Sequence, residues 1–312
     1  MSEENSNCSW KDKKSRALRG IRKKDVFLHR HAFKGDYMYD ELEERLGRIK
    51  ILISKRENYR WRHYSHTGMI SYKGRKLRIF LNPKETYMPE CFIEISNPSQ
   101  AYLVKLKKAV PDLNIHFLEY TLDLYCSSAV AVRRLFDVLP KYYYVPHARK
   151  VSFPGKPGRR NMHTSELNRT FKISKLKIYE RGEDKTPWGE GWYRTELDRV
   201  RVEYKATEGL LSYHGMNSLN DLIVNCNFES IFLKRFQFKI FRNSGQLPKE
   251  NDRYAKVDKL ECFQKQYIEA KKRGIKNLNQ RIKDAPGFDS LKKSVKRKVK
   301  KFDRNWRIKL NT

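Results

Sequence analysis

The chain has 312 residues, 39% of them apolar, and its 68 Lys and Arg against 36 Asp and Glu give a formal net charge of +32. Such a charge attracts polyanions, because each neutralised phosphate releases condensed counterions, so nucleic acid is the leading partner. Five cysteines without a Cys-x-x-Cys pair argue against a structural zinc site, and no apolar run approaches a membrane span, so we expect a cytoplasmic protein without membrane contact.

The N-terminal part of the chain is basic and poor in apolar anchors. Residues 11–24 form a charge run, which we expect to stay mobile or to coat phosphate. His29 and His31 have ligand-like spacing, but no strand pattern surrounds them, so they receive little weight as metal ligands. Asp40–Leu46 is predicted to form a short acidic helix.

Strand and helix patterns begin near residue 59. Met69–Tyr72 and Leu77–Leu81 flank a Lys73-Gly74-Arg75 turn, which predicts a hairpin. Ala101–Val110 has apolar residues at helical spacing, and a second helix is expected from the Ser127-Ser128 cap to Pro140.

Residues 141–170 change character: Lys141-Tyr-Tyr-Tyr144 is followed by Phe153-Pro-Gly-Lys-Pro-Gly-Arg-Arg160, where Pro and Gly forbid regular structure. Tyr142 to Tyr144 could stack on bases of a single strand or pack beneath the following loop. The loop is basic and could follow a nucleic acid strand through Lys156, Arg159 and Arg160.

The C-terminal third is predicted to be helical. Helices are expected over Ser218–Phe236 and Val257–Ile282, and Leu291–Lys309 has the pattern of a basic amphipathic helix. Its candidate nucleic-acid-binding cations are Lys292, Lys293, Lys296, Arg297 and Lys298.

Together these segments predict an α+β fold, a mainly antiparallel sheet with helices on one face and a basic helical C-terminal extension. We expect a basic N-terminal arm and short helix over residues 1–58, a catalytic domain over 59–215 and a helical basic region over 216–312.

Four predicted strands carry carboxylates or a tyrosine on the face opposite their apolar residues. Because side chains alternate along a strand, Glu94, Glu119, Asp123, Tyr179 and Glu203 would all lie on the open face of a shared sheet. Glu119 and Asp123 are about 13 Å apart along one strand, at roughly 3.3 Å per residue, so binding one ion needs help from neighbouring strands. Converging carboxylates would suit Mg²⁺ or Mn²⁺.

This face predicts metal-assisted attack on a phosphodiester. Tyr179 could attack phosphorus and form a covalent phosphotyrosyl intermediate. The flanking cations Lys177, Arg181 and Arg201 could offset the phosphate charge. His116 could ligate metal near Glu119, although a lone histidine is more often structural.

A simpler interpretation is open at this point, because half-exposed strands normally place charged residues on their solvated side. The protein would then be a non-catalytic basic nucleic-acid-binding protein whose acidic residues form surface ion pairs. A third hypothesis is an RNA-binding or RNA-processing protein that uses a similar sheet.

The order of these strands resembles that of the rolling-circle replication initiators, in particular the filamentous-phage gene II/X type and the plasmid replication initiation factors. Phe117-Leu-Glu-Tyr-Thr-Leu-Asp123 resembles their Arg-Ile-Asp-x-x-x-Asp strand, and Lys177-Ile-Tyr-Glu-Arg181 resembles their Arg-Ile-Tyr-Asp-Lys strand. The similarity covers about residues 70–210.

The resemblance implies a metal-dependent endonuclease that nicks one strand at the replication origin of a phage or plasmid. It places Tyr179 as the nucleophile joined to the 5′ phosphate, Glu119 at the first Asp, and Glu94 and Glu203 at the acids of the flanking strands. The partners it implies are origin DNA, single-stranded or supercoiled, and a host helicase or polymerase.

Overall fold

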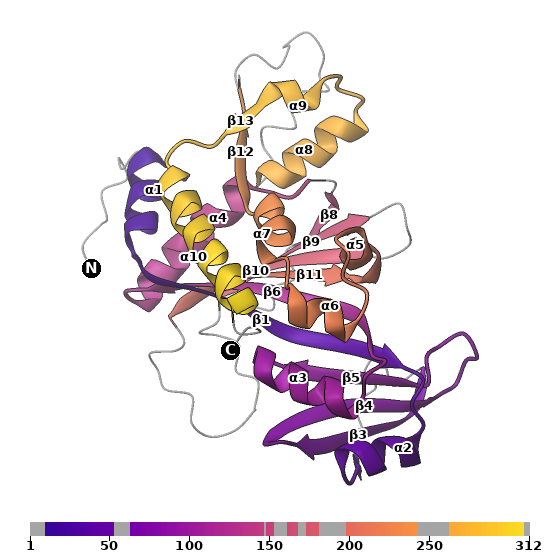
Figure 1. The fold of residues 1–312 in the computed structure, drawn as a ribbon. Coiled ribbons are helices and arrows are strands. Elements are labelled where there is room, and N and C mark those ends of the chain that lie inside the picture. Colours follow the sequence, from indigo (N-terminus) through magenta and orange to yellow (C-terminus); the bar gives the residue numbers. More distant parts are fainter. Residues whose placement is uncertain are drawn as a thin grey trace. The chain divides into compact units, whose positions relative to one another are not determined.

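The fold is α+β with a large antiparallel sheet, as the sequence predicts (Figure 1). The computed structural model describes residues 10–52, 63–146, 148–152, 161–167, 173–180, 198–242 and 262–308. Within these ranges no helix combines the length and apolarity needed to cross a membrane.

The chain forms two compact units, each built from three segments. The first unit comprises residues 1–26, 121–204 and 229–300, and the second comprises residues 27–120, 205–228 and 301–312. The units interleave along the chain and do not follow the predicted ranges 1–58, 59–215 and 216–312. Among the described elements, five contribute residues to both units: β1 (Ile21–Gly35), β6 (Asn114–Cys126), β11 (Arg199–Thr207), α7 (Phe228–Phe232) and α10 (Asp289–Ile308).

In the second unit the strands are ordered β2-β3-β4-β5-β1-β6, and the first five pair antiparallel. The predicted hairpin is confirmed as β3–β4, and its turn residues Lys73 and Gly74 have φ values of 46° and 77°. Two consecutive positive φ values are typical of a type I′ turn, whose twist suits a hairpin. The strand bounds are β2 (Lys50–Ile51), β3 (Tyr64–Tyr72), β4 (Arg75–Pro83) and β5 (Cys91–Ser96).

The helices of the second unit follow local capping signals. The predicted acidic helix is confirmed as α2 (Tyr39–Leu46), and the predicted helix near residue 101 is confirmed as α3 (Gln100–Ala109). Ser99 caps α3 by accepting a hydrogen bond from the Tyr102 backbone N–H. A capping box opens α6 (Leu219–Val224), which follows α5 (Glu208–Tyr213).

In the first unit the strands are ordered β1-β6-β11-β10-β9-β8. Backbone pairing builds three strands in the described part of residues 141–170, and the segment 153–160, for which no regular structure was expected, lies outside the described residues. A separate sheet has the order β13-β12-β7. The bounds are β7 (Tyr143–Tyr144), β8 (Ala148–Ser152), β9 (Asn161–Leu167), β10 (Ile173–Glu180), β12 (Gln237–Phe241) and β13 (Ile282–Asp284).

Residues 10–35 are ordered, which corrects the expectation of a mobile charge run. Trp10–Arg19 form α1, which packs on α4, and β1 starts at Ile21. The side chains of Ala17 and Lys14 are buried at 1% and 9% exposure, so α1 is anchored by a small residue and the stem of a lysine. The hydrophobicity pattern of the sequence does not predict that either side chain is buried.

Two predicted helices have different ends. The helix after Ser128 is α4 (Ala129–Tyr142), and it continues two residues beyond Pro140. The expected helix Ser218–Phe236 is broken, because Asn225 ends α6 and Asn227 has a left-handed φ of 50°. The pieces after this break are α7 (Phe228–Phe232) and a 3₁₀ turn, η3 (Leu233–Arg235).

The C-terminal region contains further helices. In the described part of the expected helix Val257–Ile282, Gly274 (φ 72°) and Asn277 (φ 57°) separate α8 (Phe263–Lys272) from α9 (Leu278–Arg281). Packing around Phe263 joins α8 and α9 to β12 through Phe241 and Leu278. The predicted basic amphipathic helix is confirmed as α10.

Candidate active site

All four predicted metal-binding carboxylates are buried. Glu94, Glu119, Asp123 and Glu203 are 8%, 4%, 1% and 5% exposed. The expectation of an open, solvated acidic face is therefore wrong, because both faces of these strands are covered. A buried carboxylate is costly unless charged or hydrogen-bonding groups compensate it, so its partners define what it can do.

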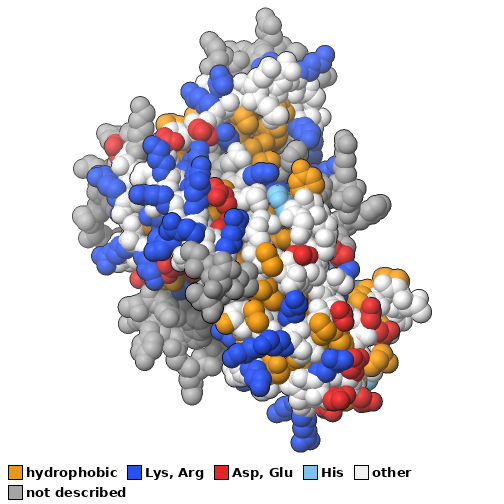
Figure 2. All heavy atoms as spheres, in the orientation of Figure 1, with side chains coloured by type: hydrophobic (Ala, Val, Ile, Leu, Met, Phe, Trp, Pro, Cys, Tyr) orange, Lys and Arg blue, Asp and Glu red, His pale blue; other side chains and the backbone are white. Residues whose placement is uncertain are grey.

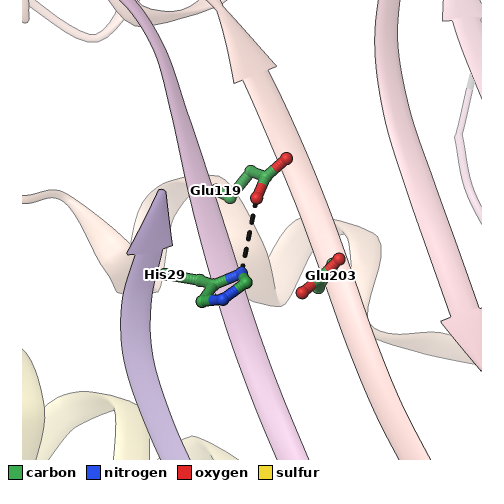
Figure 3. Close-up of side chains that lie close together, drawn as sticks. All are labelled: His29, Glu119 and Glu203. Atoms are coloured by element: carbon green, nitrogen blue, oxygen red, sulfur yellow. Dashed lines mark ion pairs between the residues drawn. The ribbon is translucent and has the colours of Figure 1, made fainter. Parts of the chain in front are cut away.

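In the second unit the structure brings Glu94 on β5 and Glu119 on β6 together around Arg30 on β1. Arg30 Nη2 lies 3.2 Å from Glu94 Oε2, and Arg30 Nη1 lies 3.9 Å from Glu119 Oε1. His29 Nδ1 is 3.5 Å from Glu119 Oε2, and Figure 3 shows the imidazole turned toward that carboxylate. We call these four residues the histidine cluster.

The sequence interpretation gave His29 little weight and missed Arg30. A signal was present, since the ring side chains of Phe27, His29, His31 and Phe33 recur at every second position, as expected for one face of a strand. His31 is fully buried, and burial, helped by the charge of His29, lowers its pKa to about 3, so its ring stays neutral. The two histidines thus differ, because His31 is enclosed and neutral whereas His29 faces the carboxylate of Glu119.

In the first unit Asp123 is held by two arginines of β11. Arg201 grips it with Nε 2.6 Å from Oδ1 and Nη2 2.7 Å from Oδ2, and Arg199 Nε lies 3.1 Å from Oδ2. A bidentate, charge-assisted pair of this kind is strong and directional. Both oxygens of Asp123 are therefore engaged by guanidinium groups, which favours a positioning role over metal ligation.

Tyr179 on β10 points its phenol at Glu203 on β11. The Tyr179 hydroxyl donates to Glu203 Oε1 over 2.8 Å, and Arg201 Nη1 lies 3.5 Å from the same oxygen. Burial alone lowers the pKa of Arg201, but the hydrogen bond and charge of Asp123, with Tyr179 and Glu203, raise it above its ordinary value. We call Asp123, Tyr179, Arg199, Arg201 and Glu203 the tyrosine cluster.

Strand alternation on β10 explains the exposure of the phenol. Leu176 and Ile178 are 0% exposed, whereas Lys177 and Tyr179 are half-buried on the other side of the strand. Lys177 therefore shares a face with the phenol, as predicted. Arg181 lies outside the described residues.

The other predicted site residues are placed as follows. Arg201, expected to contact nucleic acid, is 3% exposed and turned to Asp123. His116 is half-buried with its ring 4.6 Å from that of Phe92 and Nδ1 3.9 Å from Glu208, which fits the structural interpretation. Three loop cations lie outside the described residues: Lys156, Arg159 and Arg160.

The helix cations are placed on the surface. Lys293, Lys296, Arg297 and Lys298 are exposed, and Lys292 is half-buried with its ammonium 3.1 Å from Asp284. Figure 2 shows Lys and Arg side chains gathered on this part of the surface.

A comparison with protein-family models finds no matching family, and a comparison with curated proteins finds no matching sequence. The function of this chain must therefore be argued from the chemistry of the two clusters and from its charge.

Proposed function

We propose that this protein is a metal-dependent DNA nuclease that cuts one strand by attack of Tyr179 and stays joined to the cut end. The observation that carries this proposal is the 2.8 Å hydrogen bond from the Tyr179 hydroxyl to Glu203. A free phenol has a pKa of about 10 and is a poor nucleophile at neutral pH, so it needs a neighbouring base. Glu203 is in the position such a base requires.

The residues of the tyrosine cluster can divide the work of transesterification. As the phenol oxygen bonds to phosphorus, Glu203 takes its proton, the bond from phosphorus to the 3′ oxygen breaks, and that oxygen leaves as a hydroxyl after protonation by water. Asp123 fixes the guanidinium of Arg201, which lies beside the reacting pair and can offset negative charge.

A divalent cation fits the donor set of the histidine cluster. We propose that His29 and Glu119 of the histidine cluster bind Mn²⁺ or Mg²⁺. Imidazole with carboxylates favours Mn²⁺ over Mg²⁺, which prefers all-oxygen ligands. When bound, the ion would polarise a phosphodiester oxygen. Arg30 Nη1 lies 3.9 Å from Glu119 Oε1, so Arg30 and the ion would share this carboxylate.

The biological setting rests on the resemblance drawn from the sequence. If the order of strands reflects relationship to the rolling-circle initiators, the cut is made at the replication origin of a phage or plasmid, and the released 3′ hydroxyl primes synthesis. The clusters themselves support only the chemistry of the cut.

The test is formation of a covalent adduct. Supercoiled DNA carrying a candidate origin, incubated with the protein and Mn²⁺, should yield a denaturation-resistant protein–DNA adduct that EDTA prevents. Tyr179→Phe should abolish it. Tyr125→Phe, which removes another half-buried phenol of the same unit, should leave the yield unchanged. An unchanged yield in Tyr179→Phe would move the nucleophile elsewhere.

The second candidate is a non-catalytic nucleic-acid-binding protein. It is favoured by the arginine pairing of the buried acids, since Asp123 is bound by Arg199 and Arg201, and Glu94 by Arg30. It predicts salt-dependent binding that chelators do not change and no adduct with any metal. Preference for RNA over DNA of equal length would favour its RNA-binding version.

A further inference from the structure

Helix α10 presents two chemically different sides. Its apolar side is packed in the protein, with Leu291, Val295, Val299 and Trp306 at 5%, 0%, 0% and 8% exposure. Because this side is buried, the helix cannot insert it into a lipid surface as a membrane-bound amphipathic helix does. The exposed side carries four cations that belong to the first unit, here called the α10 cations: Lys293, Lys296, Arg297 and Lys298.

The α10 cations differ from their neighbours on the same helix. Lys292 pairs with Asp284 at 3.1 Å, and Lys300 pairs with Glu229 at 3.5 Å. Among the residues that the structure describes, no carboxylate forms an ion pair with any of the four α10 cations. Lys292 and Lys300 are thus neutralised by carboxylates, whereas the α10 cations that lie between them are not.

A further cation reaches the same place from β1. Burial, followed by the charges of Lys298 and Arg297, lowers the pKa of Lys24. Like charges held this close repel one another, and an external polyanion relieves the repulsion.

Helix α1 contacts the segment that leads into α10. Lys14 Nζ donates to the carbonyl oxygen of Pro286 and lies 5.5 Å and 5.8 Å from the ring centres of Tyr142 and Phe288. The exposed Arg16 and Arg19 and their helix therefore stand beside α10, and Figure 2 shows the basic side chains of this region as one area.

The described part of this surface offers no platform for stacking bases. Proteins that hold single strands stack bases on exposed aromatic rings. Among the described residues of the first unit, Val130 is the only large apolar side chain that is clearly exposed. The contacts that the described residues offer to a nucleic acid are therefore contacts to phosphate.

We propose that the α10 cations bind the phosphate backbone of duplex DNA without reading its sequence. The α10 cations span about 8 Å along the helix axis at 1.5 Å per residue, comparable to about two base pairs of duplex. The choice of DNA in this inference rests on the proposed function. The ligand of this surface is the duplex part of the substrate and not the strand that is cut.

The experiment measures binding without cleavage. Fluorescence anisotropy with a labelled 20-bp duplex of arbitrary sequence is recorded in EDTA from 50 to 200 mM NaCl, using the full chain with Tyr179→Phe. The test variant is Lys293→Gln/Lys296→Gln/Arg297→Gln/Lys298→Gln. The control, Arg48→Gln/Lys50→Gln/Lys105→Gln/Lys108→Gln, removes one Arg and three Lys from exposed positions of the second unit.

The test variant should make the plot of log K against log salt concentration less steep by about 3.6, since it removes four cations and each phosphate contact contributes about 0.9. The control should keep the slope of the parent, and a Lys→Arg version of the three α10 lysines should too. Equal slopes for test and parent, an equal loss in the control, or tighter binding of single strands than of duplex would overturn the inference. Because no cut is measured, the outcome is independent of whether Tyr179 is the nucleophile.

Discussion

The two acidic clusters hold their carboxylates in different ways. In the histidine cluster the partner cations are partly accessible, with the side chains of Arg30 and His29 at 39% and 19% exposure and contacts of 3.2 to 3.9 Å. In the tyrosine cluster Arg201 and Arg199 are 3% and 5% exposed, and Arg201 meets Asp123 at 2.6 Å. The first arrangement can exchange a partner for an ion, whereas the second is fixed and suits positioning.

The largest expected effect is on the proposed base. Glu203→Gln keeps the size of the side chain but cannot accept the phenol proton, so adduct formation should slow by about 10² to 10⁴-fold. The measurement is the single-turnover rate in Mn²⁺. Glu208→Gln, which alters a carboxylate paired with Lys34, should stay near the parent rate. A Glu203→Gln rate within tenfold of the parent would remove Glu203 from the chemistry.

The contrast in burial predicts unequal effects on stability. Asp123→Asn leaves the buried Arg201 without its counter-charge and should lower the free energy of unfolding by about 3–5 kcal/mol. Glu94→Gln affects the more exposed Arg30 and should cost under about 1 kcal/mol. Urea unfolding at pH 7.5 measures both. Equal losses would mean that the two clusters are held alike.

Alkaline pH probes one buried thiol in each unit. Burial raises the pKa of Cys91 and of Cys126 from 9.0 to about 12. Below pH 9 both thiols are protonated in the folded and the unfolded chain, so their full contribution to the free energy of unfolding is present. Above pH 9 the unfolded chain loses these protons first, so stability falls as pH rises toward 12.

At pH 10 each thiol should account for about 1.4 kcal/mol of this fall, from 1.36 kcal/mol per pKa unit. Cys91→Ala and Cys126→Ala should each make the drop in unfolding free energy between pH 8 and pH 10 smaller by that amount. If neither variant changes the drop, the thiols are not the titrating groups.

Metal stabilisation of the histidine cluster should be of the same size as the effect of one thiol. Mn²⁺ at ten times its dissociation constant should raise the free energy of unfolding by about 1.4 kcal/mol. His29→Gln should abolish this increase, and His116→Gln, a change on the neighbouring strand β6, should keep it. The same increase in both variants would place the ion elsewhere.

Local signals in the sequence predicted much of the fold. The Lys73-Gly74 turn, the Ser128 cap and the apolar side of α10 are short-range features, and each was found where expected. Alternation also identified Glu119 and Asp123 as members of one face of β6. What it could not give is burial, because a polar face that is covered by protein has the same alternation as one facing water.

The partners of the acids depend on long-range pairing. Arg30 meets Glu94 through the pairing of β1 with β5, and Arg201 meets Asp123 across 78 positions of the chain. His29 was undervalued because its strand is flanked by charged residues, although Phe27 and Phe33 share its alternation. The order of the strands in the sheet decides which cation pairs with which carboxylate. The sequence of a single segment does not contain this information.

The most direct test of the account identifies the residue that carries the DNA. After reaction in Mn²⁺, the adduct is digested with nuclease and protease, and the peptide bearing a nucleotide is sequenced by mass spectrometry. The account predicts a phosphodiester on the oxygen of Tyr179 and on no other tyrosine. A modified peptide that lacks Tyr179, or a cut that leaves no covalent adduct, would contradict it.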